Sequence, residues 1–361
     1  MFRFVVDDLV DELGRVIGRS AFSGTVAVWG PDGRIVTVAR GHAHRGRAIP
    51  ATADTRYAVA SATKGVTALV IASLVGDGAL EFDTRFRSVV GDLLSMVDDR
   101  VTIEQLLAHT SGVGDYLDES LGGDVDDHVL TVPAHQLESP REYRRVIDGF
   151  PQAFAPGERF EYNNGAYVML SIVAEIVSET SFYDLVTERV TRPAGMQHTG
   201  FLRSDRLDGD VAVGYLEDGR SNVFHLPVRG AGDGGMYTTV ADIERFWHAL
   251  FAGDIVPLEV VEWMTAPTSV VPGEGMRYGR GFWLAGDGPE VTLGGKDAGV
   301  SFRSTHDPTT GHGYVVVSNT SSGTWPVAAV LESHLGGDAS VRTGRASDKN
   351  RHAPTERSTH P

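Results

Sequence analysis

The stretch that most constrains the fold is residues 57–75, YAVASATKGVTALVIASLV. A short strand-like run ends at Ser61, and a long apolar segment without proline follows, which predicts a helix buried on most sides. Lys64 lies one helical turn after Ser61 on the same face, so the two side chains can meet. A buried lysine can take the proton of a serine hydroxyl, and a helix N-terminus offers N–H groups to an oxyanion. S-x-x-K alone is a weak motif, and Ser61 as a simple N-cap is the alternative.

Composition narrows the classes of protein to which the chain can belong. Its 361 residues suffice for one large domain or two interleaved lobes, and 41% hydrophobic with 22% charged residues is typical of a soluble globular protein. A net charge of −16 argues against a nucleic-acid partner, and the lack of cysteine excludes disulfides and thiolate metal sites. The acidic opening is unlike a signal peptide and no apolar run approaches 18 residues. We therefore expect a cytoplasmic protein without a membrane segment; its oligomeric state is left open.

Periodicity and turn signals predict the order of the elements. Helices are expected at 2–18, 102–107, 141–149, 165–177, 182–190, 239–251 and 325–335. Strands are expected as a hairpin about Pro-Asp-Gly at 23–40, as two strands at 211–228 around Glu-Asp-Gly, and at 278–285, 290–293, 299–305 and 313–319.

This order predicts an α+β fold in which the first and last segments share one antiparallel sheet flanked by helices, with the N- and C-terminal helices on one face. We expect a single domain over residues 1–336. An α/β lobe (about 1–60 and 205–336) and a mostly helical lobe (about 61–204) would enclose a site in the cleft between them. Residues 337–361 lack apolar rhythm and are predicted to be a disordered tail.

Several polar positions have both a functional and a structural interpretation. Tyr162 and Asn164 precede a helix, where they are either site groups or a core aromatic and a helix cap. His109 follows a short helix and is interpreted as a structural histidine that bonds local backbone. The acidic segment 113–140 is interpreted as a solvated, mobile flap over the site, because its spacing matches no calcium loop. The glycines of 230–239 indicate a close backbone approach. No metal or cofactor is predicted.

Taken together, the motifs resemble the penicillin-recognising serine hydrolases, the class C β-lactamase, DD-peptidase and esterase superfamily. The resemblance covers roughly residues 5–335. It is carried by S-A-T-K at 61–64, Y-N-N at 162–164, and L-G-G-K-D-A-G-V-S-F-R-S at 293–304, in that order. The L-L-A-H-T-S-G and G-G-M-Y-T-T stretches are similar to the family as well.

The resemblance implies a role for each matching residue. Ser61 would be the acylated nucleophile, and Lys64 would take its proton or hold its proton network. Tyr162 would be a general acid or base whose phenol pKa is lowered by the Lys64 cation. Asn164 would bond Lys64 or the acyl amide of the substrate.

The third motif implies the oxyanion hole and contains one departure from the family. The backbone N–H groups of Ser61 and of Lys296, which follows Gly295, would hold the oxyanion. At Leu293 the family usually has Lys or His, which helps hold a substrate carboxylate, and leucine cannot; the Lys296 side chain is expected on the other face of the strand.

The sequence thus favours a serine hydrolase acting on small esters or amides. The alternatives are a β-lactamase or D-Ala-D-Ala peptidase, an acyltransferase that uses the same acyl-enzyme, and a non-catalytic penicillin-binding sensor.

Overall fold

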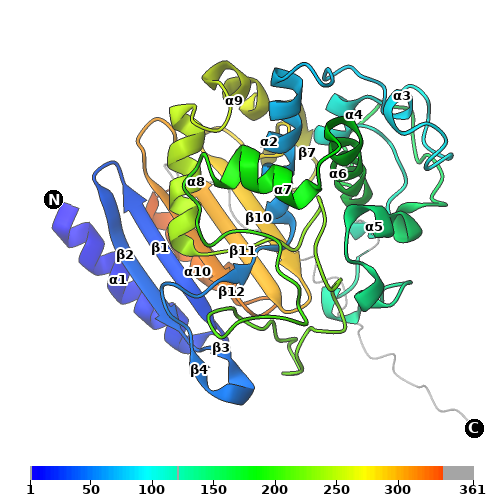
Figure 1. Cartoon of the computed structure of the whole chain (residues 1–361). Coiled ribbons are helices and arrows are strands. Elements are labelled where there is room, and N and C mark those ends of the chain that lie inside the picture. Colours follow the sequence, from blue (N-terminus) through cyan, green and yellow to red (C-terminus); the bar gives the residue numbers. More distant parts are fainter. Residues whose placement is uncertain (1, 120–121, 336–361) are drawn as a thin grey trace, which may run out of the picture.

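One eight-stranded antiparallel sheet joins the two ends of the chain (Figure 1). The computed structural model describes residues 2–119 and 122–335, so the predicted tail lies outside the described residues. The strand order is β2-β1-β12-β11-β10-β9-β8-β7. The strands are β1 (Gly24–Gly30), β2 (Gly33–Arg40), β7 (Ser269–Val271), β8 (Met276–Tyr278), β9 (Trp283–Ala285), β10 (Val291–Asp297), β11 (Val300–His306) and β12 (Gly313–Ser318). The predicted sharing of one sheet by the first and last segments is confirmed, with Gly24 opposite Ser318 and Trp29 opposite Gly313.

Side chains of the central strands point alternately to the two faces of the sheet, and a separate hydrophobic core lies on each face. Val26 and Val28 of β1 and Val316 of β12 pack against α1 (Phe2–Arg19) and α10 (Thr324–Leu335). Ala27 and Trp29, from the opposite face of β1, belong to the larger core that continues into the helical part of the molecule. Successive side chains of a strand point to opposite faces, so each central strand serves both cores. The predicted α+β fold with both terminal helices on one face is confirmed.

The remaining helices lie partly on the opposite face of the sheet and partly beside it, towards the right of Figure 1. They are α2 (Thr63–Gly76), α3 (Phe86–Val90), α4 (Ile103–Leu107), α5 (Pro140–Ile147), α6 (Asn164–Ser178), α7 (Phe182–Val186) with a π-helical extension at Thr187–Thr191, α8 (Val240–Ala252) and α9 (Leu258–Thr265). Two small ribbons, β3 (His42–His44) with β4 (Ile49–Pro50) and β5 (Tyr57–Ala58) with β6 (Tyr237–Thr238), connect these layers. Helix α2 is buried along almost its whole length, as its apolar composition predicts.

Side-chain caps fix where three of the helices begin. Thr102 and Gln105 form a capping box at α4, Thr239 accepts the N–H of Asp242 at α8, and Asn163 accepts the N–H of Ala166 at α6. Each cap satisfies a backbone donor that the first helical turn leaves free. The start of α6 therefore follows directly on Tyr162, which matters for the site below.

The prediction of two strands at 211–228 is wrong. The segment makes only single bridges, from Val211 to Arg56 and from Tyr215 to Ser221 and Thr320. Its backbone bonds go to several different segments, so no ladder forms. Residues 211–216 are also nearly all buried rather than alternating. The predicted strand at 278–285 is in fact two strands, β8 and β9, joined by a turn that the Gly279 N–H closes on the Phe282 carbonyl. Strand β7 and helix α9 were not predicted.

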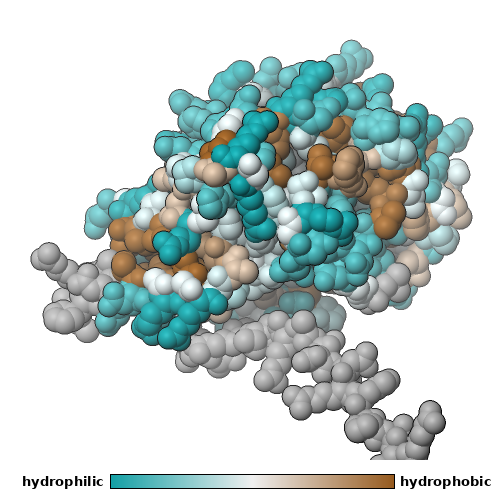
Figure 2. Space-filling model, turned by 90° about the horizontal axis from the view of Figure 1, so that it is seen from below, coloured by the Kyte–Doolittle hydropathy of each residue, from teal (hydrophilic) through white to brown (hydrophobic). Residues whose placement is uncertain are grey.

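Seen from below, the surface is mainly hydrophilic, with separate hydrophobic patches (Figure 2). Among the described residues, the most exposed large hydrophobic side chains are Val129, Phe224 and Val270, at 79%, 84% and 74% exposure. No single described helix is long and apolar enough to cross a membrane. Helix α6 and the helix from Phe182 to Thr191 reach the required length and apolar composition only when taken together, and the two are bent by 91° relative to each other.

Candidate active site

Ser61 lies in a 3-10 turn, η2 (Ala60–Ala62), between β5 and α2. The residue before it, Ala60, has a φ of 47°, a left-handed conformation that is unfavourable for a residue with a side chain. Two bonds hold this turn: the Val59 N–H donates to the Met236 carbonyl, and the Thr63 hydroxyl donates to the Ala60 carbonyl. Ser61 is half-buried and lines an open pocket, so its hydroxyl is reachable from solvent.

Lys64 is 2% exposed, and its ammonium has three acceptors. Nζ lies 2.9 Å from Oγ of Ser61, 2.8 Å from Oδ1 of Asn164 and 2.8 Å from the Asp233 carbonyl oxygen. A lysine ammonium has three donors, and all three are used here. The structure thus brings together Ser61, Lys64 and Asn164, which the sequence separates by up to 103 positions.

Tyr162 completes the cluster but differs electrostatically from the prediction. Its side chain is hydrogen-bonded to Ser61, and Lys64 Nζ lies 4.9 Å from the centre of its ring. The prediction that the lysine cation lowers the phenol pKa is wrong: burial, helped by the Glu119 carboxylate, raises the pKa of Tyr162 well above 10, and the bond to Ser61 opposes this only in part. Desolvation disfavours the charged phenolate, so the phenol keeps its proton at neutral pH.

Asn164 is held from both ends of its amide. Its Oδ1 accepts from Lys64, while Nδ2 donates to the Leu117 carbonyl at 2.9 Å and to Oε1 of Glu119 at 3.3 Å. The Asp115 carboxylate accepts the backbone N–H of Asn164 at 2.7 Å, and burial raises the pKa of this carboxyl to about 6. These bonds orient the amide so that its oxygen faces the lysine.

Strand β10 runs directly beside the serine turn. A Cβ at Gly295 would lie 2.3 Å from the Val59 carbonyl oxygen and 2.8 Å from the Ser61 nitrogen, so only glycine permits this approach. Lys296 is exposed and lines the pocket, whereas Leu293 is 3% exposed and packs against Gly65 of α2. Lys296 therefore points to the face of β10 opposite to that of Leu293 and does not replace it, which agrees with the alternation of side chains along a strand.

The glycine-rich segment at 230–235 supplies a residue that sequence reasoning missed, Asp233. The segment passes close to α6, because a Cβ at Gly232 would lie 2.2 Å from the Tyr167 carbonyl oxygen. This close passage brings the Asp233 carbonyl to Lys64. The signal in the sequence is a single aspartate among four neighbouring glycines, which indicates a buried, tightly packed position.

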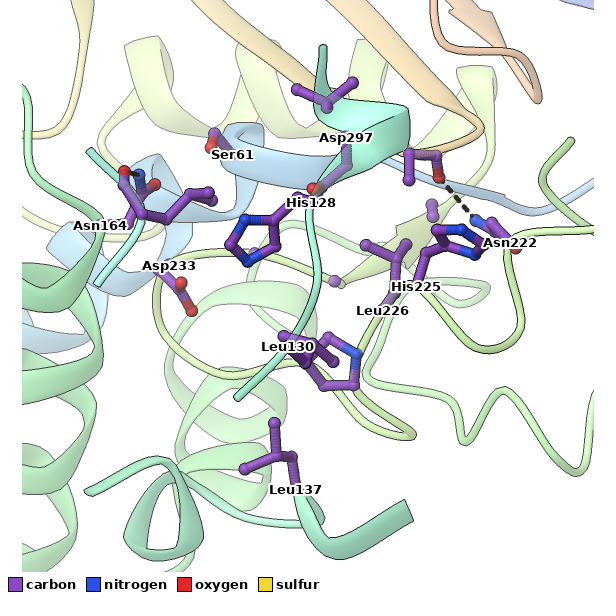
Figure 3. Close-up of a pocket in the computed structure, with 18 of the residues that line it drawn as sticks. Ser61, His128, Leu130, Leu137, Asn164, Asn222, His225, Leu226, Asp233 and Asp297 are labelled. Atoms are coloured by element: carbon purple, nitrogen blue, oxygen red, sulfur yellow. Dashed lines mark hydrogen bonds between the residues drawn. The ribbon is translucent and has the colours of Figure 1, made fainter. Parts of the chain in front are cut away.

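Three carboxyl groups, those of Glu119, Asp233 and Asp297, line the pocket, and Figure 3 shows Asp233 and Asp297 near Ser61. Asp233 is 7% exposed and accepts the hydroxyl of Tyr116, and burial raises its pKa. Burial, with a further contribution from Asp233, raises the pKa of Asp297 to about 7. The side of the pocket next to Ser61 is therefore acidic.

The described parts of the acidic segment 113–140, residues 113–119 and 122–140, border the pocket and are bonded to other segments, while the mobility of the expected flap stays a prediction. Tyr116 is bonded to Asp233, and Asp126 accepts the Glu217 N–H at 2.8 Å and the Ser321 hydroxyl at 2.5 Å. Apolar and aromatic members of the segment face the pocket. Within residues 2–119 and 122–335, no group of three or more His, Cys, Asp or Glu side chains is placed to hold a metal ion.

His109 lies behind the cluster and has no contact with Ser61. It is fully buried, with a φ of 56°, and its ring centre lies 4.4 Å from that of Tyr162. Nδ1 accepts the backbone N–H of Asn163 at 3.1 Å. The expected bond to local backbone is thus replaced by one to a segment 54 residues away. Burial and the Lys64 charge lower the pKa of His109 well below 6.5, so the ring is neutral.

Comparison with known proteins shows which family the chain belongs to. The profile of the family described as Beta-lactamase matches residues 6–335. Penicillin-binding protein 4* of Bacillus subtilis (strain 168) is 29% identical over 266 residues, which are 69% of this chain and 56% of the relative. The chain spans about half the length of the curated relatives it matches.

Two solved structures are similar over most of the chain. The penicillin binding protein from Bacillus halodurans has a TM-score of 0.82 at 35% identity, covering 89% of this chain and 99% of that one. The octameric penicillin-binding protein homologue from Pyrococcus abyssi has a TM-score of 0.77 at 26% identity, covering 92% and 77%.

The position of His109 generates a prediction for stability. Replacing it with alanine leaves the buried Asn163 N–H without an acceptor and opens a cavity, so His109→Ala should lower the free energy of unfolding by about 2–4 kcal/mol. His109→Asn keeps an acceptor and tolerates the left-handed backbone, so its loss should be smaller. Urea unfolding at pH 7.5 measures both; equal losses would contradict this role.

The same histidine predicts a pH dependence. Its pKa is lower in the folded than in the unfolded chain, so the unfolded chain binds more protons below about 6.5. This histidine should therefore lower the free energy of unfolding as the pH drops from 6.5 towards 5, while Asp115 and Asp297, whose pKa values burial raises, act in the opposite direction. The measurable quantity is the difference between the two proteins: the free energy of unfolding of the wild type relative to that of His109→Asn should fall over this range, and parallel curves for the two proteins would show that His109 does not contribute.

Proposed function

Because the chain belongs to the Beta-lactamase family and has a serine hydrolase fold of that family, we propose that it cleaves esters or amides through an acyl-enzyme on Ser61. One observation carries the proposal: a buried ammonium 2.9 Å from a serine hydroxyl that lines an open pocket. A serine hydroxyl becomes a useful nucleophile only when an adjacent group removes its proton.

In the proposed acylation step, the Lys64 ammonium first releases one proton to solvent. Ser61 Oγ then bonds to the substrate carbonyl carbon while its own proton passes to the free amine at Nζ. Asn164 and the Asp233 carbonyl hold Nζ in place for this transfer. The protonated Tyr162 donates its proton to the leaving oxygen or nitrogen and regains one from Lys64. Water, or another acceptor, then releases the acyl group and frees Ser61.

The backbone N–H groups of Ser61 and Lys296 are proposed as the oxyanion donors. The close approach of Gly295 to the Ser61 nitrogen supports this, because it brings the β10 backbone beside the serine turn. Fixed backbone donors stabilise the charge that develops on the carbonyl oxygen.

Acylation by penicillins is the second candidate, and the names of the relatives from B. subtilis and B. halodurans favour it. Leu293 argues for neutral substrates instead. It is apolar and packed on α2, so it offers no charge and no hydrogen bond to a substrate carboxylate.

The proposed nucleophile is tested by covalent labelling. An alkyl fluorophosphonate should add once to the wild type and not at all to Ser61→Ala, as measured by intact mass. Ser204→Ala is the matched control, since Ser204 lines the same pocket, and it should label fully. Lys64→Ala should label about 10²–10⁴-fold more slowly. Equal labelling of wild type and Ser61→Ala would refute the proposal.

The role of Leu293 is tested by adding the missing cation. Leu293→Lys should raise the acylation rate with benzylpenicillin relative to that with its methyl ester by roughly tenfold, because a lysine can bind the carboxylate. Leu293→Met has a similar length and no charge, so its ratio should equal that of the wild type. The idea fails if the Lys and Met variants give the same ratio while both remain folded by thermal melting.

A further inference from the structure

The wall of the pocket away from Ser61 is lined by apolar side chains that remain partly exposed. The pocket is a void of about 1150 Å³ that continues into solvent. Half-buried apolar residues that line it are Leu117, Val125, Leu130, Leu202, Val223 and Leu226. Apolar surface that folding leaves exposed inside a concave pocket is surface that a ligand can cover favourably.

Two exposed apolar side chains belong to the segments that line the pocket. Val129 lies between His128 and Leu130, which line the pocket, and is 79% exposed. Phe224 lies between Val223 and His225, which also line it, and is 84% exposed. Two of the most exposed hydrophobic side chains among the described residues therefore flank the lining segments of one pocket.

The arrangement in space separates the polar and apolar ends of the pocket. Figure 3 shows Ser61, Asn164 and Asp233 at one end, with Leu130, Leu137 and Leu226 extending away from them. Three of the polar side chains on this side are His128, Asn222 and His225, and Nδ1 of His225 has no hydrogen-bond partner among the described residues. Burial lowers the pKa of His128, and Asn222 donates to the Ala298 carbonyl at 2.8 Å. Little on this side would favour a charged ligand.

We propose that the substrate carries an extended apolar chain, which lies along the wall formed by Leu226 and Leu130 while its ester or amide carbonyl sits at Ser61, and that Val129 and Phe224 form the rim where this wall ends. This inference rests on the proposed function and names its substrate class: an ester or amide with a chain of several carbons rather than an acetyl-sized group. Each methylene that leaves water on this wall adds to binding, so affinity should rise with chain length until the chain passes the rim.

Turnover of two ester series tests the proposal. In one series the acyl chain grows from two to eight carbons with 4-nitrophenol as the leaving group; in the other the alcohol grows with a constant acetyl group. We expect kcat/KM to rise on the order of tenfold or more along at least one series. A flat profile in both series would overturn the inference, even if every ester is hydrolysed.

Substitutions on the rim locate the effect. Phe224→Ser and Val129→Ser change exposed side chains, so both variants should fold, and each should reduce the eight-carbon to two-carbon ratio several-fold. Val270→Ser is the matched control, because Val270 is equally exposed on β7 and does not line the pocket. An equal eight-carbon to two-carbon ratio in all three variants would contradict the proposed binding of the chain along the apolar wall.

A binding measurement separates failure of this inference from failure of the proposed function. Calorimetry with Ser61→Ala compares octanamide with acetamide, neither of which needs a nucleophile to bind. Tighter binding of octanamide, weakened by Leu226→Asn and Phe224→Ser but not by Val270→Ser, supports the apolar wall even if no ester is turned over. Equal affinity for the two amides would refute it, whatever the labelling of Ser61 shows.

Discussion

The buried ammonium of Lys64 is the interaction on which the arrangement of the site depends. Its three acceptors come from three separate parts of the chain: the serine turn, the start of α6 and the glycine-rich segment. A charge taken out of water is very unfavourable unless it is hydrogen-bonded and compensated. The segments that carry Ser61, Asn164 and Asp233 are therefore held to one point by a single cation.

The surroundings of that cation are arranged by a balance between burial and attraction. Burial raises the pKa values of Asp115, Asp233 and Asp297, and in each case the Lys64 charge lowers them in part. The carboxyl groups compensate the cation while each is bonded to a backbone or side-chain donor. The same burial keeps the Tyr162 phenol protonated, which favours a role as general acid over a role as general base.

The parts of this site that could be predicted are those written in short, local patterns. The spacing of Ser61 and Lys64, the cap at the start of α6 and the hairpin at 24–40 each follow from residues near one another. The predictions that failed depend on contacts between distant parts of the chain. Nothing near Tyr162 in the sequence indicates that its phenol will lie in a desolvated site beside Glu119, and the pattern at 211–228 does not reveal that its neighbours lie in different segments. Asp233 was missed because its contribution comes through its backbone carbonyl.

The sequence by itself determined the fold class, the shared sheet and the residue types able to perform acyl transfer, because periodicity, turn residues and the S-x-x-K spacing are local properties of the chain. Only the tertiary structure decided which groups meet Lys64, the charge state of Tyr162 and the apolar wall that runs away from Ser61. These depend on burial and on contacts between residues more than a hundred positions apart, such as Lys64 and Asp233. Local patterns cannot encode the desolvation that such contacts impose.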